Sequence, residues 1–385
     1  MPSTTSHKPI HIGLNAHLLS LAETYRSAGA NQYIRNLLLN LPRVDEENRY
    51  TVFLGERGFD AHPSLNLRFS HLPTENPPVR LFWEQAVQPF ALRRERVDLL
   101  HSLAFVSPLV SPCPTVVTIY DLSFLLFPEG FRCLKRLYLG LFTRISARRA
   151  RRIIAISEST KKDIVRMFGV PPERVDVVYC GVDETFRPLP EEQVADFRKR
   201  HGPPERFILF VGTLEPRKNV TRLIEAYSLL VARHPSLKLV IGGAKGWFYE
   251  NIFAEVERLG LQGEVLFPGF IPRRELPLWC NAAELFVYPS LYEGFGLPPL
   301  EAMACGTPVI ASDTSSLPEV VGEGGMLVNP VDVEALAGAM GRVLSDEALR
   351  QTMSEQGLRR AGHFSWRKMA RETVQVYRRA MEHGG

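Results

Sequence analysis

The sequence predicts an α/β protein made of two tandem doubly wound, Rossmann-like domains that face each other across a cleft. Three observations predict this class. Apolar strand-like runs alternate with amphipathic helical segments, which is typical of parallel sheets covered on both faces. The alternation pauses at a proline-rich stretch and then restarts. The chain has 385 residues, more than one core usually holds, since domains average roughly 150 residues.

The first half begins with an apolar run at residues 10–14, followed by a helical segment for which Asn31 is the expected cap. Further strands are expected at residues 51–55, 99–103, 115–120, 152–157 and 175–182. The segments between them fit helices, at residues 82–92, 135–148 and 159–168. These elements predict a first domain over residues 1–186.

The second half follows a connection rich in proline and charge, and it starts with a buried-strand run at residues 207–212. Further strands are expected at residues 237–243, 265–269, 285–290, 308–312 and 325–329. Helical segments lie between them, and three more follow Asp332. We therefore expect a second domain over 187–364 and a helical C-terminal segment over 365–385. Ligands of such sheets bind at the carboxyl ends of the strands.

Composition excludes several classes of protein. With 45% hydrophobic and 23% charged residues and no low-complexity tract, the chain is neither disordered nor a coiled coil. A net charge of +4 is too small to indicate a nucleic-acid partner. The five cysteines are scattered without a Cys-x-x-Cys pair, so they predict neither a disulfide framework nor zinc. No apolar run is long enough for a signal or a membrane span, so a cytoplasmic location is expected.

The most informative stretch, residues 289–308, leads from a strand end through Gly294 and Gly296 into a short helix. Glycines let backbone N–H groups approach an anion, and a helix N-terminus adds favourable partial charge. Glu293 and Glu301 bracket this turn, and carboxylates suit hydroxyl donors such as a sugar or a ribose. Two prolines between them disfavour the alternative, one continuous solvated helix. The stretch therefore predicts a nucleotide-sugar site.

A second motif follows the strand that ends at Gly212 and Thr213. Arg217 and Lys218 precede the next helix, where cations are unfavourable to the helix dipole unless an anion is bound. An arginine fork and a lysine point charge can together clamp a diphosphate. The alternative is a solvated basic pair in a loop, but the position at a strand end favours the clamp.

Residues 131–156 hold eight basic residues and no acidic one, interleaved with apolar residues. A basic amphipathic helix can lie on an anionic membrane. Alternatively, its apolar residues, among them Leu137, Leu141 and Ile145, pack on the sheet while the basic face is solvated. A doubly wound domain needs such a helix, which favours the second interpretation.

Together these motifs resemble the retaining GT-B glycosyltransferases of family four, and in particular bacterial mannosyltransferases of envelope polysaccharide assembly. Glu293 and Glu301 are similar to the family's E-x7-E signature. The resemblance covers nearly the whole chain and includes Gly29 and the segments 118–124, 155–163, 181–183, 215–219, 316–321 and 364–366.

This resemblance implies an enzyme that moves a hexose, such as mannose, from a GDP- or UDP-hexose to a glycan or lipid-linked acceptor with retention of configuration. No cofactor is implied, and the chain has neither an Asp-x-Asp nor a His-Glu-x-x-His motif for a metal. The first domain is the acceptor side, and the final helix packs back on it. A peripheral contact with the inner face of a membrane through 131–156 is compatible with a lipid-linked acceptor.

The resemblance also implies a role for each site residue. Arg217 and Lys218 neutralise the leaving diphosphate, and Glu301 accepts hydrogen bonds from the ribose. The donor sugar and diphosphate are held by Glu293 and by the amides of Gly294, Phe295, Gly296 and Leu297. Gly29 lets the first-domain loop close onto the diphosphate. Further contacts with the donor are expected from Tyr120, Asp121, Gly212 and Thr213.

Two positions depart from the family pattern. Thr213 stands where many relatives have arginine, and Arg217 could supply that charge. Tyr120 stands where many have the histidine that precedes Asp121, and tyrosine can donate a hydrogen bond but cannot replace an imidazole. Two other functions on this fold stay open, a non-catalytic nucleotide-sugar-binding protein and a nucleotide-sugar isomerase. A Rossmann oxidoreductase is disfavoured because no Gly-x-Gly-x-x-Gly occurs.

Overall fold

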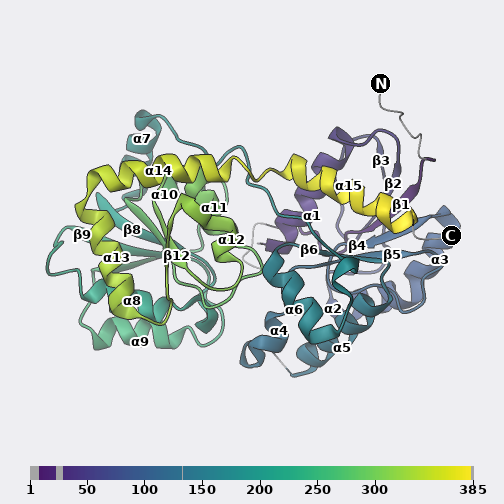
Figure 1. Cartoon of the computed structure of the whole chain (residues 1–385), viewed down its shortest axis with the longest axis horizontal. Coiled ribbons are helices and arrows are strands. Elements are labelled where there is room, and N and C mark those ends of the chain that lie inside the picture. The colour runs from purple at the N-terminus through teal and green to yellow at the C-terminus, as the bar shows by residue number, and fades with distance from the viewer. Residues whose placement is uncertain (1–7, 23–28, 132, 383–385) are drawn as a thin grey trace. The chain divides into compact units, whose positions relative to one another are not determined.

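The computed structural model describes residues 8–22, 29–131 and 133–382, and it divides into two compact units (Figure 1). Unit 1 comprises the residues up to Tyr179 together with those from Trp366 onwards, and unit 2 comprises Cys180–Ser365. The sequence predicted these divisions after residues 186 and 364. The last helix, α15 (Trp366–Glu382), contacts other elements of unit 1.

Unit 1 contains a sheet of seven parallel strands in the order β3-β2-β1-β4-β5-β6-β7. The strands are β1 (His11–Asn15), β2 (Arg49–Leu54), β3 (Leu65–Phe69), β4 (Leu99–Ser102), β5 (Thr115–Ile119), β6 (Arg152–Ala155) and β7 (Val175–Val177). Strand β3 was not predicted, because it lies at the sheet edge and its polar side chains interrupt the apolar run. The other strands confirm the prediction, although β7 ends well before residue 182.

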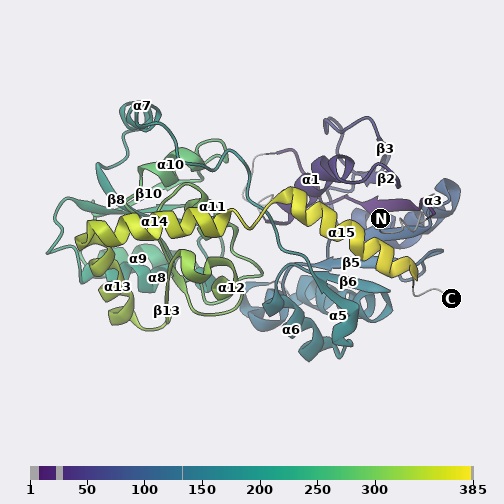
Figure 2. The same cartoon turned by 45° about the horizontal axis from the view of Figure 1, so that its top comes forward.

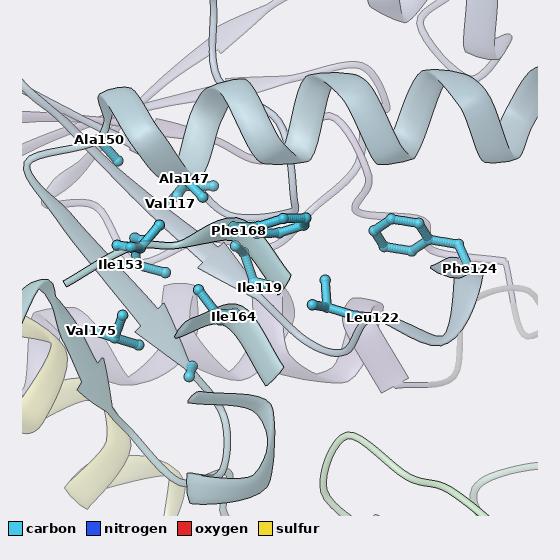
Figure 3. Packing of buried hydrophobic residues seen from close by; sticks show 12 residues of the cluster. Val117, Ile119, Leu122, Phe124, Ala147, Ala150, Ile153, Ile164, Phe168 and Val175 are labelled. Atoms are coloured by element: carbon cyan, nitrogen blue, oxygen red, sulfur yellow. The ribbon is translucent and has the colours of Figure 1, made fainter. Parts of the chain in front are cut away.

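Helices cover both faces of this sheet (Figure 1). They are α1 (Gly29–Asn40), α2 (Pro77–Phe82), α3 (Gln88–Glu95), α4 (Ser123–Leu126), α5 (Cys133–Arg149), α6 (Glu158–Phe168) and α15, with a π-helical turn at Trp83–Val87. In the core, Ile119 of β5 and Ile153 of β6 pack with Phe168 of α6 (Figure 3). Asn31 is not the cap of α1 but lies inside it, where its side chain bonds the backbone of Ser20.

Unit 2 contains a sheet of six parallel strands in the order β10-β9-β8-β11-β12-β13. The strands, which confirm the prediction, are β8 (Arg206–Val211), β9 (Leu237–Gly242), β10 (Val265–Gly269), β11 (Leu285–Tyr288), β12 (Val309–Ser312) and β13 (Met326–Val328). The helices are α7 (Glu191–His201), α8 (Val220–Ser228), α9 (Glu250–Arg258), α10 (Leu276–Ala282), α11 (Leu297–Ala304), α12 (Leu317–Val321), α13 (Val333–Ser345) and α14 (Glu347–Ala361). Helices α11 and α14 lie side by side (Figure 2).

Strand order in unit 2 reverses between β8 and β11, which pair with each other although they are far apart in sequence. In open parallel sheets the loops after two such strands diverge to opposite faces and leave a crevice for ligands at the carboxyl edge. Both predicted motifs, after residues 212 and 289, belong to these two loops. In the described part of the chain no helix is both long and apolar enough to span a membrane.

Candidate active site

The loops after β8 and β11 are bonded to each other through their backbones. The Leu291 amide donates to the Arg217 carbonyl at 2.8 Å, and the Ser290 hydroxyl donates to the same oxygen at 3.1 Å. The 3-10 turn Pro216–Lys218 therefore lies directly against the start of the 289–308 stretch. The two motifs that the sequence analysis treated separately form one site.

Lys218 and Glu293 form a buried ion pair at the centre of this site. The Lys218 ammonium lies 2.5 Å from Glu293 Oε1 and donates to the Tyr288 hydroxyl at 2.7 Å. The same Oε1 accepts hydrogen bonds from the hydroxyls of Ser290, at 2.6 Å, and Tyr288, at 3.1 Å. Buried charges are tolerated when they are paired and hydrogen-bonded in this way. This network fixes the Lys218 side chain in the loop after β8.

Arg217 joins the network from its other side. Its Nη1 lies 3.2 Å from Glu293 Oε2 and also donates to the Tyr292 carbonyl, while its Nη2 donates to Glu215 Oε1 at 2.6 Å. Two cations thus face two carboxylates, Glu293 and Glu215, all within a few ångströms. The cluster carries no net charge when all four groups are ionised, and an incoming diphosphate would bring negative charge to two preplaced cations.

Burial and charge shift the pKa values of this cluster in opposing directions. Burial raises the pKa of Glu293, but Lys218 and Arg217 outweigh it and bring the pKa to about 2. Burial lowers the pKa of Lys218, against the opposing effect of Glu293. The pKa of Glu215 is raised by burial despite the neighbouring arginine. Glu293 is therefore the carboxylate held as an anion most firmly.

Two backbone conformations shape the loops. Gly296 precedes α11 with φ of +114°, and a Cβ there would lie 2.7 Å from Leu317 Cδ2, so only glycine fits without a shift. Asn219, with φ of +59°, donates from its side chain to the carbonyls of Pro289, at 3.0 Å, and Pro330, at 2.6 Å. Leu297 starts α11 and Pro298 follows it within the first turn, where a proline is well tolerated.

Glu301 occupies a separate position on α11. Its carboxylate pairs with Arg273, whose Nη1 lies 2.8 Å from Oε1, and not with the cations around Glu293. Gly212 and Thr213 follow β8 in the first loop. A Cβ on Gly212 would lie 3.2 Å from Phe210 Cζ, which is a tight contact, and 3.8 Å from Lys218 Cε, which is an ordinary one.

The remaining predicted site residues lie in unit 1. Tyr120 is buried, and its hydroxyl donates to the Leu103 carbonyl at 2.5 Å. Asp121 accepts a hydrogen bond from the Ser123 amide at 2.8 Å. Gly29 is the exposed first residue of α1, and a Cβ there would meet nothing within 4 Å. The Tyr120 hydroxyl thus donates to backbone, and its expected contact with the donor stays a prediction.

Sequence analysis missed three partners of these residues: Glu215, Tyr288 and Arg273. Glu215 lies just before the basic pair, and Tyr288 ends β11 directly before the 289–308 stretch. Their positions next to the two motifs could therefore have indicated them. Arg273 had none, because it reaches Glu301 from the segment between β10 and α10. Within the described ranges, no group of three or more His, Cys, Asp or Glu residues could hold a metal ion.

Comparisons with known proteins identify the family of the chain. The model of the glycosyl transferases group 1 matches residues 192–360, and that of glycosyltransferase family 4 matches residues 27–186. The O-antigen chain mannosyltransferase B of Escherichia coli is 34% identical over 296 residues, which are 76% of this chain and 77% of that protein. The serotype-specific mannosyltransferase WbdA of Escherichia coli is 33% identical over 281 residues, which are 70% of this chain but only 34% of WbdA.

Among solved structures, sucrose-phosphate synthase from Thermosynechococcus elongatus superposes with a TM-score of 0.77 at 24% identity, covering 97% of this chain and 99% of that one. Two doubly wound α/β units with this strand order define the GT-B class of fold. The chain belongs to glycosyltransferase family 4.

Proposed function

We propose that the protein transfers mannose or a similar hexose from a GDP- or UDP-hexose to a glycan or lipid-linked acceptor during polysaccharide assembly. The observation that carries this proposal is the placement of Arg217 and Lys218 on Glu293 at the point where strand order reverses. The mannosyl donor and the polysaccharide product are supported by the names of the two Escherichia coli relatives.

The proposed reaction breaks the bond between the anomeric carbon and the diphosphate oxygen, and it forms a bond from that carbon to the acceptor oxygen. The acceptor proton passes to a diphosphate oxygen, and the configuration is retained because attack occurs on the same face. Charge grows on the leaving diphosphate, where Arg217 and Lys218 stabilise it. Preorganised electrostatic stabilisation of this kind is typically the largest catalytic contribution. Retention is supported by the resemblance to the family.

Metal independence is part of the proposal. It is supported by the two side-chain cations beside Glu293, which could supply at the proposed diphosphate site the charge that a divalent ion supplies elsewhere. Their orientation is set by Glu293 and Glu215, so they need no reorganisation when charge develops.

The experiment combines a donor screen with product analysis. Thermal shift with GDP-mannose, UDP-glucose and related nucleotide sugars identifies the donor, and turnover is then measured with and without a mannan acceptor. We expect a glycosidic product, with its anomeric configuration retained by NMR, only when acceptor is present. Binding without turnover would favour a non-catalytic binding protein, and a new nucleotide sugar formed without acceptor would favour an isomerase.

The proposal includes a peripheral contact between unit 1 and an anionic membrane through α5. The expected packing of Leu137 and Leu141 against the sheet is wrong, since these side chains are 66% and 52% exposed. Leu134 is 81% exposed and continues the same face at helical spacing. Other residues of α5 pack on the core, among them Ala147, which is fully buried, and Leu139, which is half-buried (Figure 3). An exposed leucine ridge on a helix without acidic residues suits a lipid surface.

The basic residues of segment 131–156 differ in whether they are exposed or bonded to other parts of the protein. Lys135, Arg136 and Arg144 are exposed on α5. Arg152 instead pairs with Asp176 at 2.7 Å and serves the fold. Arg132, also in the predicted set, lies outside the described residues. Arg151 donates to the Ala380 carbonyl of α15 at 3.4 Å. Replacing Arg151 by an acidic residue would therefore disturb the packing of α15, so Arg151 is not a suitable position for testing a membrane contact.

Vesicle sedimentation tests the contact. We expect salt-sensitive binding to vesicles with phosphatidylglycerol, weak binding to neutral ones, and loss of binding when Leu134 and Leu137 become serine. Leu229→Ser, at an exposed leucine of unit 2, is the matched control. Screening acts over about 10 Å at 0.1 M salt. Equal binding to both vesicle types, or binding unchanged in the leucine variant, would contradict the proposal.

A further inference from the structure

Glu301 is a buried carboxylate with one side-chain partner. Its side chain is 9% exposed, and Arg273 Nη1 donates to Oε1 at 2.8 Å. No other side chain of the described residues donates to Glu301, and Oε2 accepts no hydrogen bond from them. One oxygen of the carboxylate is thus fixed by the arginine, and the other keeps its capacity to accept hydrogen bonds.

Arg273 is itself held in place from a second direction. Its guanidinium lies over the ring of Phe186, 5.0 Å from the centroid, and Phe186 is buried in unit 2. A planar guanidinium can stack on an aromatic face and donate in its own plane at the same time, which an ammonium cannot do. The contact with Phe186 and the hydrogen bond to Glu301 hold the guanidinium from two directions.

We propose that Arg273 is a positioning residue of the donor site: it keeps the Glu301 carboxyl ionised and aims its second oxygen at the ribose hydroxyls of the nucleotide. This inference rests on the proposed function, in which Glu301 receives the ribose. A carboxylate can accept both hydrogen bonds of a ribose diol, whereas a protonated carboxyl donates one proton and loses acceptor capacity.

Apart from Arg273, the surroundings of Glu301 favour its protonated form. Burial raises the pKa of Glu301, and Arg273 is the cation that opposes the increase. Asp183, before α7, raises the pKa further. On α10, the pKa of the Cys280 thiol lies well above its usual value because of its hydrogen bond with Cys305 and its burial, so the thiol stays neutral and adds no negative charge near Glu301. Without Arg273, protonation of Glu301 would extend toward neutral pH.

The test compares Arg273→Gln and Arg273→Lys with Arg274→Gln, a matched control at the adjacent arginine, whose side chain is 75% exposed. Calorimetry measures the affinity for GDP and UDP from pH 6 to pH 9. We expect Arg273→Gln to lose at least tenfold in affinity at pH 6.5 and to recover part of it at pH 9, where Glu301 ionises. Arg273→Lys retains the charge, so its smaller loss should be independent of pH.

A deoxyribose probe separates this inference from the proposed function. Wild-type protein should discriminate GDP or UDP from the 2′-deoxy analogue, and Arg273→Gln should lose that discrimination at pH 6.5. Failure of the wild type to bind any nucleoside diphosphate would overturn the proposed function. Normal binding by the wild type, with ribose discrimination and pH profile unchanged in Arg273→Gln, would overturn the role of Arg273 alone.

Discussion

Two buried carboxylates, one in each unit, have opposite protonation behaviour. Glu293 in unit 2 lies against Lys218 and Arg217, and its pKa falls to about 2. Glu84 in unit 1 lies in the π-helical turn after α2, where its Oε1 accepts a hydrogen bond from the Asn15 side chain at 3.2 Å. No cation of the described residues lies within ion-pair distance of Glu84. Arg80 acts from farther away and lowers the pKa of Glu84, but burial outweighs this effect and raises the pKa to about 7.

The difference shows that burial does not decide whether a carboxylate is charged; the cations beside it do. Glu301 lies between the two extremes, with one arginine partner and a pKa that burial still raises. The pKa is lowered where two cations are ion-paired with the carboxylate, as at Glu293, and is raised where one or none is, as at Glu301 and Glu84. The Glu293 cluster is organised to carry charge, which fits a site for a diphosphate, whereas the surroundings of Glu84 favour a neutral acid.

The largest effect is expected from removing a cation of the Glu293 cluster. Lys218→Ala and Arg217→Ala should each lower kcat by about 100- to 1000-fold, since one preorganised electrostatic donor typically contributes about 3–4 kcal/mol to the transition state. Binding of the nucleoside should change far less. Steady-state kinetics at saturating donor measure this, with Lys199→Met, at an exposed lysine, as control. A kcat within twofold of wild type in either variant would remove that residue from leaving-group stabilisation.

The next effect is on the free energy of unfolding and concerns Glu84, whose surroundings favour the neutral acid. The pKa of Glu84 is raised to about 7 in the folded protein, so the folded state binds its proton more readily than the unfolded chain. Its contribution to the free energy of unfolding therefore declines as the pH rises toward 7 and is then constant. Glu84→Gln should remove this decline and stabilise the protein at pH 8 by on the order of 3 kcal/mol.

Urea unfolding of Glu84→Gln and wild type at pH 5, 6, 7 and 8 measures this difference. The glutamine oxygen can still accept the hydrogen bond from Asn15, so the packing is kept. Parallel pH profiles of the two proteins would show that Glu84 is ionised like an ordinary surface carboxylate.

A smaller effect should distinguish Glu293 from Glu301 by ligand. Glu301→Gln should weaken a nucleoside diphosphate and the donor alike, because both carry the ribose. Glu293→Gln should mainly weaken the donor and its turnover, because the diphosphate still meets Lys218 and Arg217. Calorimetry with both ligands on both variants measures this. The assignment fails if Glu293→Gln loses nucleoside diphosphate affinity as strongly as donor affinity.

No effect is expected from chelation. Turnover should persist in EDTA, because Arg217 and Lys218 supply the positive charge that a divalent ion would bring to the diphosphate. The check is the initial rate before and after EDTA treatment, followed by addition of Mg²⁺. Activity abolished by the chelator and restored by a stoichiometric divalent ion would show that the cluster is insufficient.

Most of the fold could be predicted because its strands are short, apolar and buried. The exception, β3, has only one buried face, and Asn66 and Arg68 interrupt its apolar pattern. The exposed ridge of α5 was also mispredicted, because hydrophobic spacing indicates an apolar face but not what covers it. Leu134 and Leu137 have the same pattern as residues that pack on a sheet.

The site could be predicted where chemistry follows a strand end. Arg217, Lys218 and Glu293 converge because β8 and β11 are neighbours in the sheet, which the doubly wound pattern implies. Their counter-charges could not be predicted in the same way. The pairing of Glu301 with Arg273 depends on how α10 packs beside α11, and no local pattern encodes that contact.

Helix α15 has a consequence for biosynthesis. Its residue Tyr377 is fully buried in unit 1, where its hydroxyl lies 2.7 Å from Nδ1 of His101. Chains are made from the N-terminus, and domains generally fold as units in the order in which they emerge from the ribosome. Unit 1 departs from that order, since every residue of unit 2 is translated before α15. In a nascent chain the surface that receives Tyr377 therefore stays uncovered until α15 has been translated, and unit 1 can finish folding only after all of unit 2 has been made.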